Sequence, residues 1–398
     1  MKRSRVVLLG SSMVGAVALL AIGQAVLEAN QGETVLAPVF EVDPFWPKPM
    51  PNHWILGSTI GVGVDSRDHI FIIHRGFATL TARTEAGLDT KPPTGECCAA
   101  APPILEFDPA GTLVKSWGGP GEGYTWPSSN HGISIDHKDN VWIGGNGNDS
   151  TARDSHILKF TKDGRFLLQI GKPGRNTNSN SLEHFGRVAK ISFDPAANEA
   201  YAADGYGNKR VAVLDMDNGA IKRYWGAYGT KNPDDASLGP YHPDSAPARQ
   251  FRNPVHCAEP TSDGLVYVCD RPNNRIQVFR KDGTFVKEQR IAPRTLGDGA
   301  VWDIAFSRDR EQKYLYLADG KNERIYVLDR QSLELLTSFG DGGRQPGQFF
   351  GVHSIATDSK GNIYTTETYE GKRLQKFVYR GLKRVKRGNQ GVPWPAKP

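Results

Sequence analysis

The sequence is poor in cysteine and methionine, with four of each among 398 residues. None of the cysteine spacings matches a zinc-binding pattern, which argues against a cysteine-based zinc site. Cys97 and Cys98 are adjacent, whereas Cys257 and Cys269 flank a turn and would lie on paired strands. A disulfide between Cys257 and Cys269 is compatible with this placement in an oxidising compartment, but the sequence does not fix the connectivity.

The body of the chain also lacks net positive charge, although the formal charge of the whole chain is +6. The first 29 residues carry +2 and residues 380–398 carry +6, which leaves −2 for the residues between them. A basic surface for nucleic acid is therefore not supported, and nucleic acid is not an expected partner.

The N-terminus has the pattern of a targeting segment. A basic start, MKRSR, precedes the charge-free apolar run VVLLGSSMVGAVALLAIGQAV. We assign residues 1–29 to a signal peptide or an N-terminal anchor, so the folded part is expected in the periplasm or outside the cell. Membrane contact is expected only through this segment, if it stays uncleaved. Residues 381–398 are assigned to a basic, proline-containing tail.

Internal repeats organise the rest of the chain. Six segments share a short apolar strand, a polar turn and a second β-rich strand, and they begin at residues 60, 131, 189, 256, 302 and 353. Most continue into a third and a fourth strand around an Asp-Gly turn. Four-stranded units at a period of about 45–70 residues predict an all-β, six-bladed β-propeller over residues 35–380.

The sixth repeat lacks an obvious fourth strand, whereas Val35–Pro44 forms a spare strand before the first repeat. We predict that this N-terminal strand joins the last blade and closes the ring. Closure of this kind leaves a propeller without two unpaired sheet edges.

Three histidines occupy one equivalent position in alternate repeats, namely His131, His256 and His353. The first strand of each blade lines the central channel, and alternate blades of six are about 120° apart. The imidazoles are therefore expected to converge on the axis. They would suit Zn²⁺ or a similar divalent transition metal with one coordination position left open. Structural histidines hydrogen-bonded inside the channel are the alternative.

Two further residues are expected near the same end of the channel. Arg75 ends the second strand of the first repeat, and Tyr206 follows the second strand of the third. Near a metal, a tyrosine can transfer a proton, and an arginine can hold an anionic group or polarise an oxygen. Arg271 and Tyr369 occupy similar positions in their repeats. Structural ion pairs are expected to join Arg210, Arg275 and Arg324 to Asp204, Asp270 and Asp319.

The repeats resemble NHL repeats, most clearly at DSKGNIY and DRPNNRIQVFRKDG. The segments GVGVDSRDHIFIIHRG, HGISID, ADGYGNKR and VHSIATDSKGNIYTTE resemble those of the peptidyl-α-hydroxyglycine α-amidating lyase family. The resemblance implies a six-bladed NHL propeller that uses zinc to split an N-acyl α-hydroxyglycine into an amide and glyoxylate. It also implies that His131, His256 and His353 are zinc ligands, Tyr206 the proton-transferring tyrosine and Arg75 the active-site arginine.

The chain departs from that family at several positions. Ser354 stands where the family has an aspartate that helps to hold a structural calcium ion. This argues against Ca²⁺, although backbone carbonyls near Val62 and Ile133 could still contribute. Gly351 stands in place of a methionine, and the insertion from Gly76 to Pro103, which could cover the channel, has no counterpart.

Taken together, these features predict an exported, metal-dependent lyase that acts on a small-molecule or peptide-derived substrate. Two alternatives remain at the level of the sequence: a metal-dependent hydrolase of lactones or esters on the same scaffold, and a non-catalytic NHL interaction module. Propeller lactonases commonly use calcium with carboxylate and amide ligands, so the imidazoles argue against them. We expect a monomer.

Overall fold

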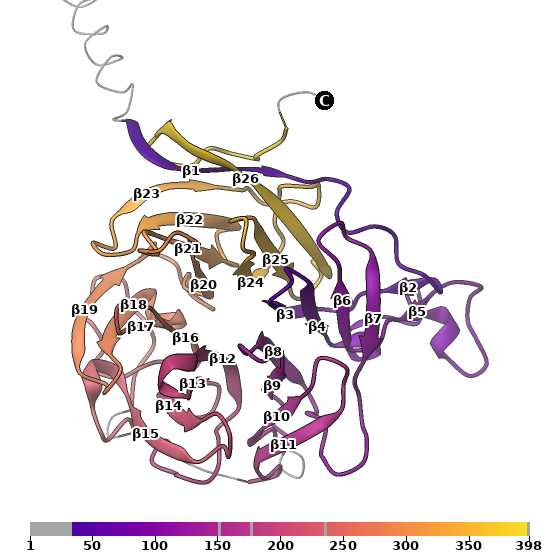
Figure 1. Cartoon of the computed structure of the whole chain (residues 1–398), viewed down its shortest axis with the longest axis horizontal. Coiled ribbons are helices and arrows are strands. Elements are labelled where there is room, and N and C mark those ends of the chain that lie inside the picture. Colours follow the sequence, from indigo (N-terminus) through magenta and orange to yellow (C-terminus); the bar gives the residue numbers. More distant parts are fainter. Residues whose placement is uncertain (1–33, 150–152, 176–177, 235–236, 396–398) are drawn as a thin grey trace, which may run out of the picture.

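The computed structural model describes residues 34–149, 153–175, 178–234 and 237–395. Its strands form six four-stranded antiparallel sheets, arranged as blades around a central axis (Figure 1). Helix in the described residues is limited to five short 3₁₀ segments. The predicted all-β, six-bladed β-propeller is therefore confirmed. The targeting segment assigned to residues 1–29 lies outside the described residues.

The first five blades are each built from strands that follow one another in the chain, from the axis outward. Blade one contains β3 (Thr59–Val64), β4 (Ile70–His74), β6 (Ile104–Phe107) and β7 (Leu113–Trp117). Blade two contains β8 (Asn130–Ile135), β9 (Val141–Gly145), β10 (His156–Phe160) and β11 (Phe166–Gly171). Blade three contains β12 (Val188–Asp194), β13 (Glu199–Asp204), β14 (Arg210–Asp215) and β15 (Ile221–Trp225). Blade four contains β16 (Val255–Pro260), β17 (Leu265–Asp270), β18 (Arg275–Arg280) and β19 (Phe285–Arg290). Blade five contains β20 (Asp303–Phe306), β21 (Tyr314–Asp319), β22 (Arg324–Asp329) and β23 (Leu335–Phe339).

Blade six combines strands from both ends of the described chain. It contains β24 (Val352–Thr357), β25 (Ile363–Glu367), β26 (Arg373–Lys386) and, at its outer edge, β1 (Thr34–Val42). β1 pairs antiparallel with β26, from Thr34 opposite Lys386 to Val42 opposite Phe377. β26 thus continues past residue 380 and takes in the first residues assigned to the tail.

The hydrophobic core is divided among the interfaces between neighbouring blades. Between blades one and two, for example, Ile60 and Ile73 pack in one cluster with Ile133 and Ile143. Strands buried on both faces read as continuous apolar runs, and every residue of β4 is buried. Because each interface is packed separately, the six inner strands are held in fixed positions around the channel.

No helix among the described residues is both long and apolar enough to span a membrane.

The insertion from Gly76 to Pro103 lies beside blade one. Its short strand β5 (Ala99–Ala100) pairs in parallel with β2 (Trp54–Ile55). Figure 1 shows both strands outside the ring of blades, so this part of the insertion does not cover the centre of the channel.

His74, the last residue of β4, anchors both ends of this insertion. Its Nδ1 accepts hydrogen bonds from the backbone N–H groups of Gly57 and Gly76, each at 3.1 Å. Its Nε2–H donates to the carbonyl oxygen of Pro102 at 2.9 Å. This pattern requires a neutral imidazole, because a protonated Nδ1 could not accept.

Acid is expected to destabilise the protein through His74. Burial lowers the pKa of His74 to about 4, below the usual 6.5 of an unfolded histidine. The stabilisation is therefore complete above about pH 6.5 and is lost as the pH falls towards 4, by up to about 3 kcal/mol in total. Denaturant unfolding at several pH values should give a shallower acid dependence for His74→Gln than for the wild type. The exposed His137, changed to Gln, serves as the control, and equal slopes for all three proteins would refute this assignment.

The expected covalent and ionic cross-links are partly confirmed. Cys257 and Cys269 form a disulfide between β16 and β17, and Cys97 forms a second disulfide with Cys98.

Two of the three expected Arg–Asp pairs also form. Arg210 contacts Asp204 at 2.8 Å, and Arg275 contacts Asp270 at 2.7 Å. The third expectation is wrong. The Nε of Arg324 instead donates to the backbone carbonyl of Asn322, and the Asn322 amide bonds to Asp319.

Candidate metal centre

The three histidines that the repeats single out lie at the start of three inner strands. His131, His256 and His353 are each the second residue of their strand, in β8, β16 and β24. The pairing register shifts at each of these positions, and such bulges re-aim side chains. Beside His131 the bulge requires glycine: Gly132 has a φ of +67°, and a Cβ there would lie 2.3 Å from the Ala189 carbonyl oxygen.

The three imidazoles converge in the channel. Their ring centres are 4.8 Å apart for His256 and His353, 4.9 Å for His131 and His353, and 5.3 Å for His131 and His256. Their ligand atoms all lie within 4.8 Å of one another, and none of the three residues is more than 3% exposed. Tetrahedral coordination with Zn–N bonds of about 2.0–2.1 Å places imidazole centres about 5 Å apart. The spacing therefore fits a zinc-sized ion.

Hydrogen bonds orient the first two histidines. Nδ1 of His131 lies 2.8 Å from the carbonyl oxygen of Ala189, and Nδ1 of His256 bonds to the carbonyl of Trp302. A carbonyl can only accept, so in both rings Nδ1 carries the proton and Nε2 keeps its lone pair. Ala189 and Trp302 occupy the histidine position in blades three and five.

The third histidine is held less directly. Nδ1 of His353 lies 3.4 Å from the hydroxyl oxygen of Ser354, which donates in turn to the carbonyl of Ile60 at 3.2 Å. Backbone carbonyls that fix the tautomer of a histidine are a common support for metal ligands. The donor set, three Nε2 lone pairs, therefore fits a divalent transition metal.

The electrostatic environment keeps the three rings neutral. Burial, together with the positive charge of Arg75, lowers the pKa of His131 to about 3. Burial also holds the pKa values of His256 and His353 well below their usual range, with Arg271 adding to the effect. Neutral imidazoles are the form that binds a metal.

Tyr206 lies directly against the histidine cluster. Its hydroxyl oxygen is 2.9 Å from Nε2 of His131 and 3.2 Å from Nε2 of His256. The backbone N–H of Tyr206 donates to the carbonyl of Arg187 at 3.2 Å, and the guanidinium of Arg187 donates to the carbonyl of Tyr206. These two backbone contacts hold Tyr206 so that its phenol lies beside the Nε2 atoms of His131 and His256.

Arg75 lies at the same end of the channel. Its Nη2 donates to Oδ1 of Asn146 at 2.9 Å, and its Nε donates to the backbone carbonyl of Asn130 at 3.4 Å. A guanidinium has five N–H groups, and no other acceptor for it lies within the described residues. Burial lowers its pKa, but an arginine remains charged at neutral pH. Arg75 therefore has N–H groups left for an anionic ligand.

Arg271 is a second cation near the histidines. The sequence analysis noted its position in the repeat but gave it no role. Its guanidinium lies 4.5 Å from the ring centre of Trp302 and 3.4 Å from a carboxylate oxygen of Asp298. The hydroxyl of Tyr369 donates to the other carboxylate oxygen at 3.1 Å. Its position in the repeat, which is equivalent to that of Arg75, is the sequence feature that could have identified it as part of the site.

Two other features do not make comparable sites. Asp65, His69 and Glu106 also cluster. However, the guanidinium of Arg67 lies 3.3 Å from both carboxylates and His69 lies 2.6 Å from Glu106. This cluster is therefore an ion-pair network that already contains its own cation.

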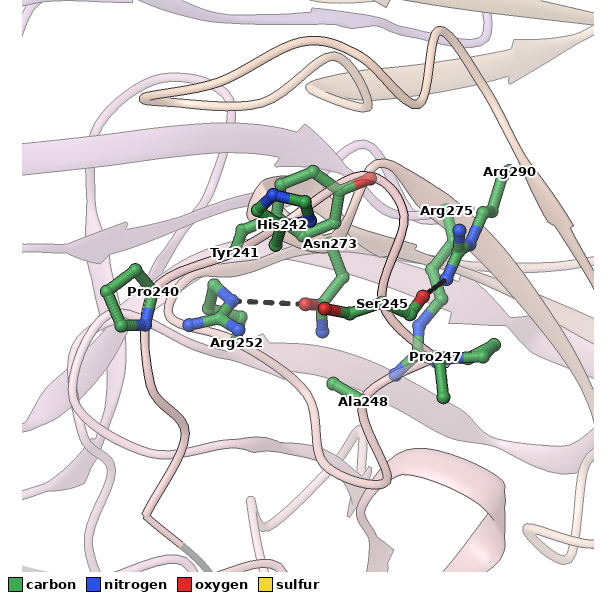
Figure 2. A pocket seen from close by; sticks show the side chains of 11 residues that line it. Pro240, Tyr241, His242, Ser245, Pro247, Ala248, Arg252, Asn273, Arg275 and Arg290 are labelled. Carbon is green, nitrogen blue, oxygen red and sulfur yellow. Dashed lines mark hydrogen bonds between the residues drawn. The ribbon is translucent and has the colours of Figure 1, made fainter.

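A pocket of about 50 Å³ lies beneath residues 240–248 and contains three arginines (Figure 2). Arg290 donates to the carbonyls of Pro243 and Ser245, and Arg252 donates to Asn273. Arg275 pairs with Asp270, so acceptors of the chain itself already hold all three arginines.

Comparisons with known proteins find one repeat match and several distant relatives. A family model described as NHL repeat matches residues 261–279. This match covers one repeat, in blade four of the six-bladed propeller. The chain is 24% identical over 360 residues to peptidyl-alpha-hydroxyglycine alpha-amidating lyase 1 of Drosophila melanogaster, covering 85% of the chain and 59% of the fly protein.

A second sequence relative and one solved structure carry other names. The chain is 26% identical over 360 residues to NHL repeat-containing protein 3 of Mus musculus, covering 86% of this chain and 84% of that one. A solved streptogramin B lyase structure superposes with a TM-score of 0.50 at 12% identity, covering 86% of this chain and 98% of that chain. The latter likeness concerns the fold alone. The chain is thus distantly similar to an amidating lyase and to an NHL repeat-containing protein.

Proposed function

We propose that this NHL propeller is a metal-dependent lyase that cleaves the C–N bond of an N-acyl α-hydroxyglycine to give an amide and glyoxylate. The observation that carries the proposal is the convergence of three buried, neutral imidazoles with the hydroxyl of Tyr206 at 2.9 Å from one of them. The distant relationship to an amidating lyase supports the choice of substrate.

His131, His256 and His353 would hold the metal, for which Zn²⁺ or a similar divalent ion suits three imidazoles. When bound, such an ion acts as a Lewis acid and lowers the pKa of a hydroxyl group that reaches it. The protein's own contribution is to keep these ligands neutral and to orient them through their Nδ1 hydrogen bonds.

Tyr206 moves the proton in this proposal. The reaction takes the proton from the α-hydroxyl, forms the aldehyde C=O bond, and releases the C–N bonding pair to the amide nitrogen, which is then protonated. A phenol hydroxyl can accept the first proton and donate its own to the nitrogen, so no proton is gained or lost overall. Its position beside the Nε2 atoms of His131 and His256 is suited to this relay.

Arg75 binds the substrate carboxylate in this proposal. The glyoxylate half of the substrate is anionic throughout the reaction, and a guanidinium with free N–H groups can hold a carboxylate through two parallel hydrogen bonds. Arg271 adds a second positive charge near the imidazoles. Both charges would strengthen the binding of an anionic substrate.

The acyl group of the substrate would bind in a separate cavity. A cavity of about 590 Å³ adjoins Arg75 and Asn130 and is lined by residues of the insertion and of the segment that leads into blade two. Phe77, Ala100 and Trp126 contribute apolar lining. Ligand sites of this size are mostly apolar with a few polar anchors. We therefore expect apolar acyl groups to be preferred over charged ones.

We also infer that the folded part acts in the periplasm or outside the cell. All four cysteines form disulfides, and such bonds persist in oxidising compartments. The apolar run at the N-terminus suits export.

The test is an assay of the purified, zinc-loaded chain with N-benzoyl α-hydroxyglycine, following glyoxylate and benzamide together. Equimolar release of both products is expected. Hydrolysis of a lactone or ester panel without glyoxylate release would favour the hydrolase alternative, and inactivity towards all substrates would favour an interaction module.

A further inference from the structure

A lysine lies inside the channel, farther along the inner strands than the histidines. The ammonium nitrogen of Lys190, in β12, is 2.7 Å from a carboxylate oxygen of Asp303 in β20. It is also 2.8 Å from a carboxylate oxygen of Glu259 in β16. The three side chains come from blades three, four and five, and their exposed fractions are 13% for Lys190, 1% for Asp303 and 16% for Glu259. We call this cluster the channel triad.

The triad ties neighbouring blades together. Besides the ammonium group, Asp303 accepts a hydrogen bond from the backbone N–H of Ile355 in blade six at 3.1 Å. Burial disfavours the charged lysine, but the carboxylates of Asp303 and Glu259 raise its pKa above the usual value. Lys190 is therefore a fixed positive charge within the ring.

The ion pair with Glu259 completes the channel triad. Oε1 of Glu259 is buried and lies 2.8 Å from the ammonium nitrogen. The attraction between the two charges depends on their distance, as it would for a spherical cation.

We propose that the ammonium group of Lys190 is the structural cation of this channel and occupies the place that a divalent cation would take between Asp303 and Glu259. Two carboxylate oxygens already converge on one point at 2.7 and 2.8 Å, and Ca²⁺ takes such oxygens at about 2.3–2.6 Å. The cavity beside them, of about 470 Å³, is also lined by Val62 and Ile133. Water from it could complete a coordination shell of six to eight oxygens.

This inference concerns the stability of the propeller and does not depend on the lyase proposal.

The experiment replaces Lys190 with methionine, which keeps most of the side-chain volume and removes the charge. The variant would leave two buried carboxylates without a counter-ion, a strongly destabilising arrangement. We expect its Tm to fall by about 5–15 °C in calcium-free buffer and to recover by at least half in millimolar calcium, with about one calcium ion bound per chain. The wild type should bind no stoichiometric calcium and show the same Tm in both buffers.

Two controls accompany this comparison. Lys138→Met removes a lysine that is 56% exposed and pairs with Asp217 on the surface, and it should not create a response to calcium. Lys190→Met combined with Asp303→Asn and Glu259→Gln should also be insensitive to calcium, because the carboxylates are gone.

Three results would overturn the proposal. The first is a folded Lys190→Met variant with equal Tm values in both buffers. The second is a Lys190→Met variant that stays unfolded in calcium, since a divalent ion would then be unable to replace the ammonium group. The third is a wild-type chain that binds one equivalent of calcium.

Discussion

Replacing Tyr206 with phenylalanine is expected to lower kcat for N-acyl α-hydroxyglycine cleavage by about 10²–10⁴-fold, with the metal content unchanged. The substitution removes only the hydroxyl that lies 2.9 Å from Nε2 of His131 and 3.2 Å from Nε2 of His256. The ring, which contacts both imidazoles edge-on, stays in place. KM should change little, because the phenol acts on the proton and does not hold the carboxylate.

The measurement compares steady-state glyoxylate release and metal content for the wild type and Tyr206→Phe. Tyr224→Phe is a matched control, since its hydroxyl donates to Asn180 at 3.2 Å on the outer side of blade three. Activity of Tyr206→Phe within about twofold of the wild type would remove Tyr206 from the mechanism. Loss of metal from this variant would instead show a ligand or structural role.

Replacing Arg75 with glutamine is expected to reduce kcat/KM by about 10²–10³-fold, or about 2.7–4 kcal/mol of transition-state stabilisation. Glutamine can keep a hydrogen bond to Asn146 but carries no charge and has no fork for a carboxylate. The loss should therefore depend on the negative charge of the substrate. Arg67→Gln, at a side chain that is 51% exposed, should behave as the wild type.

Inhibition by an N-acylglycine and by its uncharged amide separates this role from a structural one. The wild type should bind the carboxylate more tightly than the amide, and Arg75→Gln should bind both about equally. If the variant still prefers the carboxylate to the same degree as the wild type, Arg75 does not hold the anionic group.

The sequence predicted those residues of the candidate metal centre that occupy equivalent positions in the repeats. His131, His256 and His353 occur at one repeat position, and the propeller geometry brings alternate blades together at the axis. Tyr206 and Arg75 follow second strands, and a blade places that end of the strand beside the start of the first strand. These residues could be predicted from the sequence because equivalent positions in the repeats lie at equivalent positions in the blades.

Features that depend on contacts between different blades were not predicted. Lys190 and Asp303 each follow the histidine position directly, but Glu259 lies three residues beyond it, and their meeting depends on how the inner strands are offset. The cavity beside Arg75 was missed because the insertion that lines part of it has no repeat. The expected pair of Arg324 and Asp319 does not form: Asp319 accepts from the Asn322 amide, and Arg324 donates to the backbone carbonyl of Asn322 instead.

Metal content tests the central claim most directly. The purified chain, prepared with zinc and then freed of unbound metal, should contain about one zinc ion per chain by mass spectrometry. A folded His256→Ala variant should lose it, because two imidazoles remain from a set whose ligand atoms lie within 4.8 Å of one another, whereas the exposed His137→Ala control should retain it. A wild type without a transition metal, or a His256→Ala variant that keeps the full complement, would contradict the three-histidine centre and the lyase proposed on it.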